Sequence, residues 1–335
     1  MTDDITQTTG ICKECGKVLT KEDVENMEHN RRSYCISCNK EYNKISERTR
    51  KAKMVNKVWC RDNLEIMKSI PDDYVDLIYL DPPYFTQTNW KNGDIGFSDN
   101  WKSMNEYLKF MELRFIEMHR ILKPTGSIYL HVDHHAVFEL KVIMDDIFGK
   151  KNFINDIVWT YSGRETAQPR FPHKHDTILL YSKSKEYTFN TLYKPYRKEY
   201  IETFFKNDDD DGKGKYQTQP DGKGGRYKQY LNDMEGQVIN DVWDDIKPLN
   251  NFGRQQNLKY PTQKPIELLK RIIETSSNKD DIVFDPFCGS GTTLEAAIIL
   301  ERKYIGIDEK KRATKISKDR IPKFVQKTIS DIGSD

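Results

Sequence analysis

The sequence predicts an open α/β fold, in which strands and helices alternate along the chain. The apolar run Val75–Leu80 ends at a double proline, and prolines stop a strand because each ring fixes φ and removes a backbone donor. A second strand, Val283–Asp285, enters a turn with two glycines, and the helix Leu294–Leu300 and the strand Tyr304–Ile307 follow it. In an open α/β sheet the carboxyl ends of the strands are where ligands bind.

Length and composition exclude several classes of protein. The chain has 335 residues, a formal net charge of +2 and 32% charged residues, so it can bury a large core and carries no polybasic tail. No apolar run is long enough to span a membrane, and the acidic start Met1–Asp4 does not resemble a signal peptide. We therefore expect a cytoplasmic protein without a membrane partner.

Four of the six cysteines form two C-x-x-C pairs, Cys12 with Cys15 and Cys35 with Cys38. This spacing lets a tight turn present two thiolates, and two such pairs complete a tetrahedral zinc site. Since four thiolates leave no open position, the predicted Zn²⁺ is structural, in a treble-clef or zinc-ribbon module. Four unrelated buried or redox cysteines are the alternative.

A basic stretch follows the last of these cysteines and favours helix. Two interpretations are equally good: a helix that contacts phosphates, and a solvated linker helix. The cations of this stretch are Lys40, Lys44, Arg48, Arg50, Lys51 and Lys53.

Asp62 lies between a short predicted strand that starts at Val58 and a helix over Leu64–Ile70. An acid in this position either caps the helix or accepts hydrogen bonds from an adenine amino group. The residues alone leave both roles open.

The tetrapeptide Asp81-Pro82-Pro83-Tyr84 stands at the carboxyl end of the strand Val75–Leu80. It offers one carboxylate, two carbonyls stiffened by proline and one aromatic face, a set that suits a flat molecule carrying an amino group. The segment 85–101 that follows lacks clear periodicity, so we expect a mobile loop over the site.

Helices and strands continue to alternate beyond this loop. Two amphipathic helices are predicted over Ser103–Leu122 and His134–Phe148, and strands over Ser127–His131, Asp156–Tyr161 and Thr177–Tyr181. The histidines His131, His134 and His135 suggest a metal site. A strand end followed by a helix start also explains their spacing, and we expect no acid to complete such a site.

Between residues 182 and 257 the apolar periodicity weakens, and the stretches 207–215 and 221–226 are expected to be loops or disordered links. Aromatic and cationic residues interleave here, a pattern that suits phosphate contacts and base stacking (Tyr193, Tyr196, Arg197, Lys198, Tyr216, Arg226, Tyr227, Lys228 and Tyr230). A solvated surface domain has a similar composition.

The turn Asp285–Thr293 carries the cofactor signal. Its glycines allow close backbone approach, but it lacks the Gly-Lys-Ser/Thr ending of a phosphate loop and the spacing of the dinucleotide fingerprint. Asp285 at the strand end suits an amino group, and Asp308 after the next strand suits ribose hydroxyls. A nucleoside with an amino-acid tail satisfies both ends, which points to S-adenosylmethionine.

Together these motifs make the chain resemble the β-class amino-methylating DNA methyltransferases, which act on N6 of adenine or N4 of cytosine. The matching residues are Cys60–Asp62, Asp81–Tyr84, Asn240–Ile246, Tyr260–Pro265 and Asp285–Thr293, in that order. The resemblance covers roughly residues 55–330 and leaves the four-cysteine segment unexplained. It implies a Rossmann-like S-adenosylmethionine-dependent methyltransferase fold with a mostly parallel seven-stranded sheet and a permuted motif order.

The resemblance also implies roles for single residues. In the catalytic set Asp81, Pro82, Pro83 and Tyr84, the carboxylate and the Pro82 carbonyl accept hydrogen bonds from the target amino group, and Tyr84 stacks on the flipped base. The implied cofactor contacts are Asp62, Asp285, Phe287, Gly289, Ser290, Gly291, Thr292 and Asp308, with Thr262 and Lys264 on the other side of the pocket.

The motifs and the resemblance together predict four parts and several partners. The parts are a zinc-binding module with a basic linker (1–54), a catalytic half (55–182), an inserted target-recognition region (183–257) and a cofactor-binding half (258–335). DNA is the expected partner, in a prokaryotic or phage-infected cell, and a second copy of the chain and a cognate restriction endonuclease are further candidates.

Because an aspartate opens the tetrapeptide, we expect site-specific methylation of adenine N6. Methylation of cytosine N4 is the alternative, and a zinc-anchored DNA-binding protein with an inactive methyltransferase fold is a more distant one.

Overall fold

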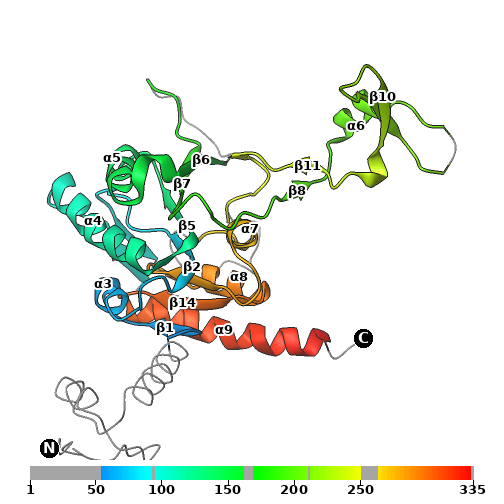
Figure 1. Cartoon of the computed structure of the whole chain (residues 1–335). Coiled ribbons are helices and arrows are strands. Elements are labelled where there is room, and N and C mark those ends of the chain that lie inside the picture. The colour runs from blue at the N-terminus through cyan, green and yellow to red at the C-terminus, as the bar shows by residue number, and fades with distance from the viewer. Residues whose placement is uncertain (1–53, 93–94, 162–168, 210–211, 250–262, 333–335) are drawn as a thin grey trace, which may run out of the picture. The chain divides into compact units, whose positions relative to one another are not determined.

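The computed structural model describes residues 54–332, apart from 93–94, 162–168, 210–211 and 250–262 (Figure 1). The chain divides into two compact units, Met1–Val55 and Asn56–Asp335, and almost all described residues belong to the second. The four cysteines, the basic stretch over residues 40–53 and Thr262 lie outside the described residues. None of the described helices is long and apolar enough to cross a membrane.

A mixed sheet of eight strands forms the centre of the second unit. Its order is β1 (Lys57–Trp59), β14 (Lys303–Ile307), β13 (Ile282–Asp285), β2 (Val75–Leu80), β5 (Leu122–Val132), β7 (His175–Ser182), β6 (Phe153–Thr160) and β12 (Val242–Trp243). Neighbours are parallel except at β7, which is antiparallel to both β5 and β6. The prediction of a mostly parallel sheet is confirmed, with one strand more than the seven expected because β12 pairs with β6.

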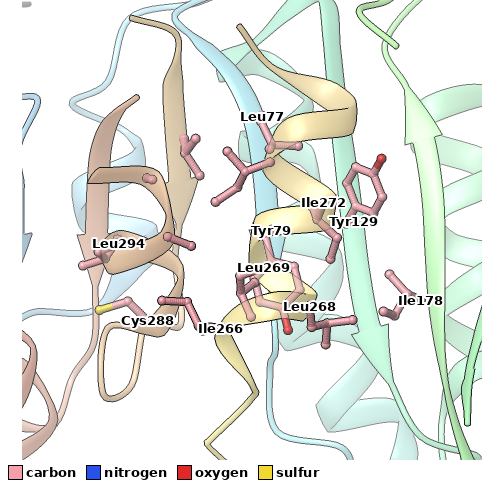
Figure 2. Close-up of a cluster of buried hydrophobic side chains, with 14 of the residues drawn as sticks. Leu77, Tyr79, Tyr129, Ile178, Ile266, Leu268, Leu269, Ile272, Cys288 and Leu294 are labelled. Carbon is pink, nitrogen blue, oxygen red and sulfur yellow. The ribbon is translucent and has the colours of Figure 1, made fainter. Parts of the chain in front are cut away.

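Helices cover both faces of this sheet. Successive side chains of a strand point to opposite faces, and Leu77 and Ile78 of β2 are both fully buried. On one face, α7 (Ile266–Ser276) packs on β2 and β5, and α8 (Thr292–Ile299) packs on β13 and β14 (Figure 2). Further helices beside the sheet are α3 (Asn63–Met67), α4 (Met104–Ile121), which contacts α3 and α5 (Val137–Met144), and α9 (Lys311–Ile332), which packs on α8 and β1.

The strand register brings two predicted motifs to the same edge. β13 pairs in parallel with β2, with Val283 opposite Leu77 and Phe284 opposite Ile78. Asp285 and the tetrapeptide consequently stand side by side at the carboxyl edge of the sheet.

The segment after the tetrapeptide is more regular than expected. β3 (Asn89–Asn92) and β4 (Ile95–Ser98) form an antiparallel pair, and the Asp99 amide donates to the Thr88 carbonyl beyond it at 3.0 Å. The prediction of a loop without regular structure over 85–101 is wrong for these residues. Gly, Asn and Asp interrupt the alternation of apolar residues that would have revealed such short strands.

The region predicted to recognise the target enters and leaves through one pair of short strands. β8 (Tyr193–Lys194) is antiparallel to β11 (Gln237–Val238), with Lys194 opposite Gln237. Between them lie α6 (Lys198–Phe204), β9 (Tyr216–Pro220), β10 (Arg226–Tyr230) and a short 3₁₀ turn, Leu231–Asp233. β9 and β10 form a hairpin whose turn is 221–225, so the loop prediction is confirmed there.

Candidate active site

Acidic residues follow neighbouring strands at the carboxyl edge of the sheet. Asp308 follows β14, Asp285 ends β13, Asp81 follows β2 and Asp133 follows β5. All four line a cavity of about 690 Å³. Most of the described site residues that the sequence suggested also line it, namely Pro82, Pro83, Tyr84, Lys264, Phe287, Gly289, Ser290 and Thr292.

Asp81 is anchored through one of its two carboxylate oxygens. The Tyr84 hydroxyl donates to Asp81 Oδ1, and the Lys264 ammonium lies 2.9 Å from that oxygen and 2.9 Å from the Tyr84 hydroxyl. Burial, and next the charge of Asp81, raise the pKa of Tyr84, which keeps its hydroxyl protonated and able to donate. No donor in the described part of the chain reaches Asp81 Oδ2. Lys264, predicted as a cofactor contact on the other side of the pocket, thus contacts the tetrapeptide.

The two proline carbonyls of the tetrapeptide differ. The Tyr107 hydroxyl on α4 donates to the Pro83 carbonyl at 2.7 Å. Among the described residues, none donates to the Pro82 carbonyl. The site therefore presents two open acceptors, Asp81 Oδ2 and Pro82 O, on consecutive residues.

The glycine turn after β13 is held by the C-terminal helix. Gly291 has a φ of +81°, and a Cβ at this position would lie 2.8 Å from Ser317 Oγ and 3.2 Å from Ser317 Cα on α9. Ser317 in turn donates to the Gly289 carbonyl at 2.7 Å. Glycine is required here both for its backbone conformation and for the close approach of α9.

Asp285 and Asp308 are buried acids beside this turn. Burial raises the pKa of Asp285 to about 7, against hydrogen bonds from the Thr293 side chain and the Phe287 amide. Burial likewise raises the pKa of Asp308 to about 6, although the Lys310 and Gly289 amides donate to it. Neither carboxylate has an ion pair among the described residues. A ligand with an ammonium group or hydroxyls would stabilise both.

Asp62 takes the capping role that the sequence left open. Its carboxylate accepts from the Leu64 amide at 2.7 Å, at the start of α3, and pairs with Arg114 at 2.7 Å. Asp62 does not line the cavity, whereas the neighbouring Asn63 does. The Asn63 side chain donates to the Pro286 carbonyl at 2.9 Å and so ties α3 to the loop after β13. An adenine contact by Asp62 stays a prediction.

His131 is fully buried and belongs to a hydrogen-bonded chain near Tyr84. Its Nε2 lies 3.0 Å from Asp176 Oδ2 and its Nδ1 lies 2.9 Å from the Tyr79 hydroxyl. Since a carboxylate only accepts, Nε2 carries the proton and the Tyr79 hydroxyl donates to Nδ1. Burial, and next the charge of Lys264, lower the pKa of His131, which keeps the imidazole neutral.

His134 and His135 form a separate cluster with Asp133. The potential ligand atoms of these three residues lie within 4.8 Å of one another, and His135 Nδ1 is 2.8 Å from Asp133 Oδ2. The expectation that no acid accompanies these histidines is therefore wrong. The three residues are consecutive at the end of β5, which agrees with the strand-end explanation of their spacing.

Sequence reasoning missed an aromatic group on the cavity wall. Phe110 of α4 lies 4.9 Å from the Trp101 ring and 6.5 Å from the Phe287 ring, measured between centroids, and Arg114 lies over it at 3.3 Å. All three aromatic residues line the cavity. Phe110 and Trp101 could not be found because an aromatic residue on a helix or in a loop more often indicates packing.

Comparison with known proteins gives a consistent family match. A family model described as a DNA methylase (N6_N4_Mtase) matches residues 75–319. The type II methyltransferase M.EcaI of Enterobacter cloacae is 33% identical over 304 residues, which cover 77% of this chain and 67% of M.EcaI. The DNA adenine methyltransferase YhdJ of Escherichia coli is 33% identical over 249 residues, covering 74% of this chain and 76% of YhdJ.

Solved structures share the fold. The cytosine-N4-specific PvuII DNA methyltransferase aligns with a TM-score of 0.54 and 17% identity, over 78% of this chain and 84% of that one. The modification methylase TTHA0409 of Thermus thermophilus, in complex with S-adenosylmethionine, aligns with a TM-score of 0.50 and 23% identity, over 80% and 94% of the two chains.

Proposed function

The chain belongs to the N6/N4 DNA methylase family, and we propose that it transfers a methyl group from S-adenosylmethionine to N6 of a flipped-out adenine in DNA. The observation that carries the proposal is the pair of open acceptors, Asp81 Oδ2 and the Pro82 carbonyl. An exocyclic amino group has two hydrogens, and one acceptor for each matches this pair.

The acceptors also account for the chemistry. The amino nitrogen of adenine normally delocalises its lone pair into the ring, and hydrogen bonds from its two N–H groups to strong acceptors localise that lone pair. The nitrogen then attacks the methyl carbon, the bond from that carbon to sulfur breaks with its electron pair left on sulfur, and the nitrogen loses a proton to water. Flipping is needed because the amino group is otherwise paired inside the duplex.

The cofactor fits the other half of the cavity. In our proposal Asp285 binds the ammonium group of S-adenosylmethionine, Asp308 the ribose hydroxyls, and the amides of the glycine turn its carboxylate. The support lies in the two buried carboxylates, which have no cation partner in the described part of the chain, and in the start of α8 beside Gly291. Phe110 and Phe287 provide apolar faces on the same cavity wall for the adenine ring.

The choice of adenine rests on the aspartate at position 81, which is more typical of the adenine enzymes in the family that the chain resembles. Cytosine N4 is the second candidate, because the same pair of acceptors would bind its amino group equally well. Among the similar proteins, YhdJ is an adenine enzyme and PvuII a cytosine-N4 enzyme.

Target recognition is assigned, in the same proposal, to residues 183–257. Exposed aromatic side chains support it, with Tyr193 41%, Phe204 50% and Tyr227 51% exposed. Aromatic rings on a surface can stack on bases, and the neighbouring cations can contact phosphates. A second copy of the chain and a cognate restriction endonuclease stay predictions.

Transfer of a labelled methyl group to DNA, followed by nucleoside analysis, tests the function. Label in N6-methyl-2′-deoxyadenosine supports the proposal, and label in N4-methyl-2′-deoxycytidine overturns the choice of base. Cofactor binding without any transfer would favour an inactive, DNA-binding relative.

The variant Asp81→Ala tests the role of the carboxylate. Because it removes an acceptor used in the transition state, we expect kcat to fall by about 100-fold or more, while S-adenosylmethionine still binds. Retained turnover would refute the assignment.

We also propose that Cys12, Cys15, Cys35 and Cys38 bind a structural Zn²⁺, on the basis of their spacing. Metal analysis should find about one zinc per chain, and Cys35→Ser should remove it without changing which base is methylated. A zinc-free wild-type protein that folds normally would contradict this.

A further inference from the structure

Asp99 is a buried carboxylate that organises the backbone immediately after the tetrapeptide. It lies just beyond β4, lines the cavity and is 1% exposed. Its Oδ2 accepts from the Tyr84 amide at 3.1 Å, the Thr86 amide at 2.8 Å and the Thr86 hydroxyl at 2.7 Å. Its Oδ1 accepts from the Phe85 amide and from the Trp101 indole, both at 3.0 Å.

These five bonds replace a cation partner. No lysine or arginine in the described part of the chain forms an ion pair with Asp99, so the buried charge is balanced by neutral donors alone. Three of the donors are successive backbone amides, which form a concave anion-binding arrangement. Hydrogen bonds to a charged acceptor are roughly twice as strong as those between neutral groups, so this arrangement is firmly held.

The backbone around these amides would not adopt its shape unaided. Phe85 has a φ of +64° and Gln87 a φ of +53°, in the left-handed region that residues with side chains rarely occupy. The bonds from Phe85 and Thr86 to Asp99 hold this segment. The Gln87 side chain adds a bond from the Trp101 amide at 2.8 Å and one to the Trp101 carbonyl at 3.0 Å.

We propose that Asp99 is a positioning residue for methyl transfer, which fixes the main chain at Tyr84 so that the Tyr84 ring, Asp81 Oδ2 and the Pro82 carbonyl meet one target base. This inference rests on the proposed function. It names the partner that gives the tetrapeptide its shape, because Tyr84 is held at its hydroxyl by Asp81 and Lys264 and at its amide by Asp99.

The Asp99 contacts reach the cofactor side as well. Trp101, which donates to Asp99, packs on Tyr107 at 5.1 Å and on Phe110 at 4.9 Å between ring centroids. Tyr107 holds the Pro83 carbonyl. Loss of Asp99 should therefore displace the acceptors relative to the methyl donor, and a shift of about 1 Å can cost about 100-fold in rate.

The variant Asp99→Asn tests the proposal in the full-length protein. Asparagine has nearly the same shape, but its amide nitrogen would face at least two of the five donors, so the arrangement cannot be kept. We expect kcat for DNA methylation to fall by about 10- to 100-fold, whereas the Kd for S-adenosylmethionine changes by less than about threefold.

Two control variants separate positioning from general damage. Asp156→Asn changes an exposed aspartate and should leave kcat and cofactor affinity unchanged. Trp101→Phe removes one donor of five and keeps an aromatic ring, so kcat should fall by less than in Asp99→Asn.

Two results would overturn the inference: an unchanged kcat in Asp99→Asn, or a parallel loss of kcat, cofactor affinity and melting temperature, which would indicate a merely structural role. Wild-type protein that transfers no methyl group to DNA would instead refute the proposed function, and the role of Asp99 in transfer with it.

Discussion

The carboxylates that line the cavity differ in whether a cation lies beside them. Asp81 has a cation beside it, because Lys264 lies 2.9 Å away, and its second oxygen is open to the target base. Asp285 and Asp308 have no such partner among the residues that the structure describes, and burial disfavours the charged form of both. In our proposal the cofactor supplies an ammonium group to Asp285 and ribose hydroxyls to Asp308, whereas Asp81 already pairs with Lys264.

The raised pKa of Asp285 predicts how stability and cofactor binding depend on pH. A buried carboxyl with a pKa of about 7 stabilises the cofactor-free fold while protonated, so that contribution is complete below pH 4 and is lost as the pH rises through 7. Each unit of pKa difference corresponds to about 1.4 kcal/mol. The free energy of unfolding of the wild type should therefore fall relative to Asp285→Asn between pH 4 and 8.

Added S-adenosylmethionine should oppose this loss, because its ammonium group stabilises the charged carboxylate. The rise in melting temperature on adding cofactor should grow with pH in the wild type and should grow less in Asp285→Asn, in which only Asp308 still titrates at the site. Asp308→Asn is the matched variant. The pH dependence that it removes lies at lower pH, near the Asp308 pKa of about 6. A cofactor effect that is equal at pH 5 and pH 8 would contradict the assignment of Asp285.

At the scale of elements, the sequence predicts the strands well because their signal is local. The runs over Val75–Leu80 and Tyr304–Ile307 end at residues that stop a strand, and both are strands in the structure. α7 and α9 went unpredicted, and so did β12, since a strand of two residues has no periodicity to detect. Its place beside β6 depends on tertiary contacts, such as the bond from Trp159 Nε1 to the Ile246 carbonyl at 2.8 Å.

Site residues, too, can be predicted only where their signal is local in the sequence. Asp81, Asp285 and Asp308 were found because each follows a strand whose end is visible in the sequence. His131 and Asp176 meet each other across 45 residues of sequence, and the backbone donors to Asp99 come from 13 to 15 residues before it. The residues next to each of these three side chains therefore do not reveal its contacts. A short motif can identify the groups that would contact the ligand, but the groups that hold them emerge only from the fold.

The glycine turn and α9 form one unit, and Gly291→Ala tests it. The alanine would be strained at φ +81° and its Cβ would meet Ser317, so we expect a loss of about 1–3 kcal/mol in stability and weaker cofactor binding. Gly222→Ala is a matched control, because Gly222 has a φ of +71° but a Cβ there meets nothing within 4 Å. Denaturant unfolding and cofactor titration measure both effects. If the two variants bind cofactor equally well, α9 does not shape the turn.

At the scale of the molecule, the segment between β8 and β11 is inserted between elements of the sheet. The chain leaves at Lys194 and returns at Gln237, which lie opposite each other in the register. The sheet does not depend on the inserted segment, because a short turn between β8 and β11 can replace it. The catalytic and recognition functions should therefore be separable.

Replacing residues 195–236 with an Asn-Gly turn tests this separation. Because β8 and β11 are antiparallel partners, the turn closes them into a hairpin without displacing β7 or β12. We expect a folded protein whose affinity for S-adenosylmethionine changes by less than about threefold, but which binds DNA weakly and without site preference, since specific binding exceeds non-specific binding by about 10³-fold or more. A variant that replaces only the hairpin turn 221–225 is the control. Sequencing of the methylated DNA would contradict the assignment if the shortened protein still modified the same sites as the wild type.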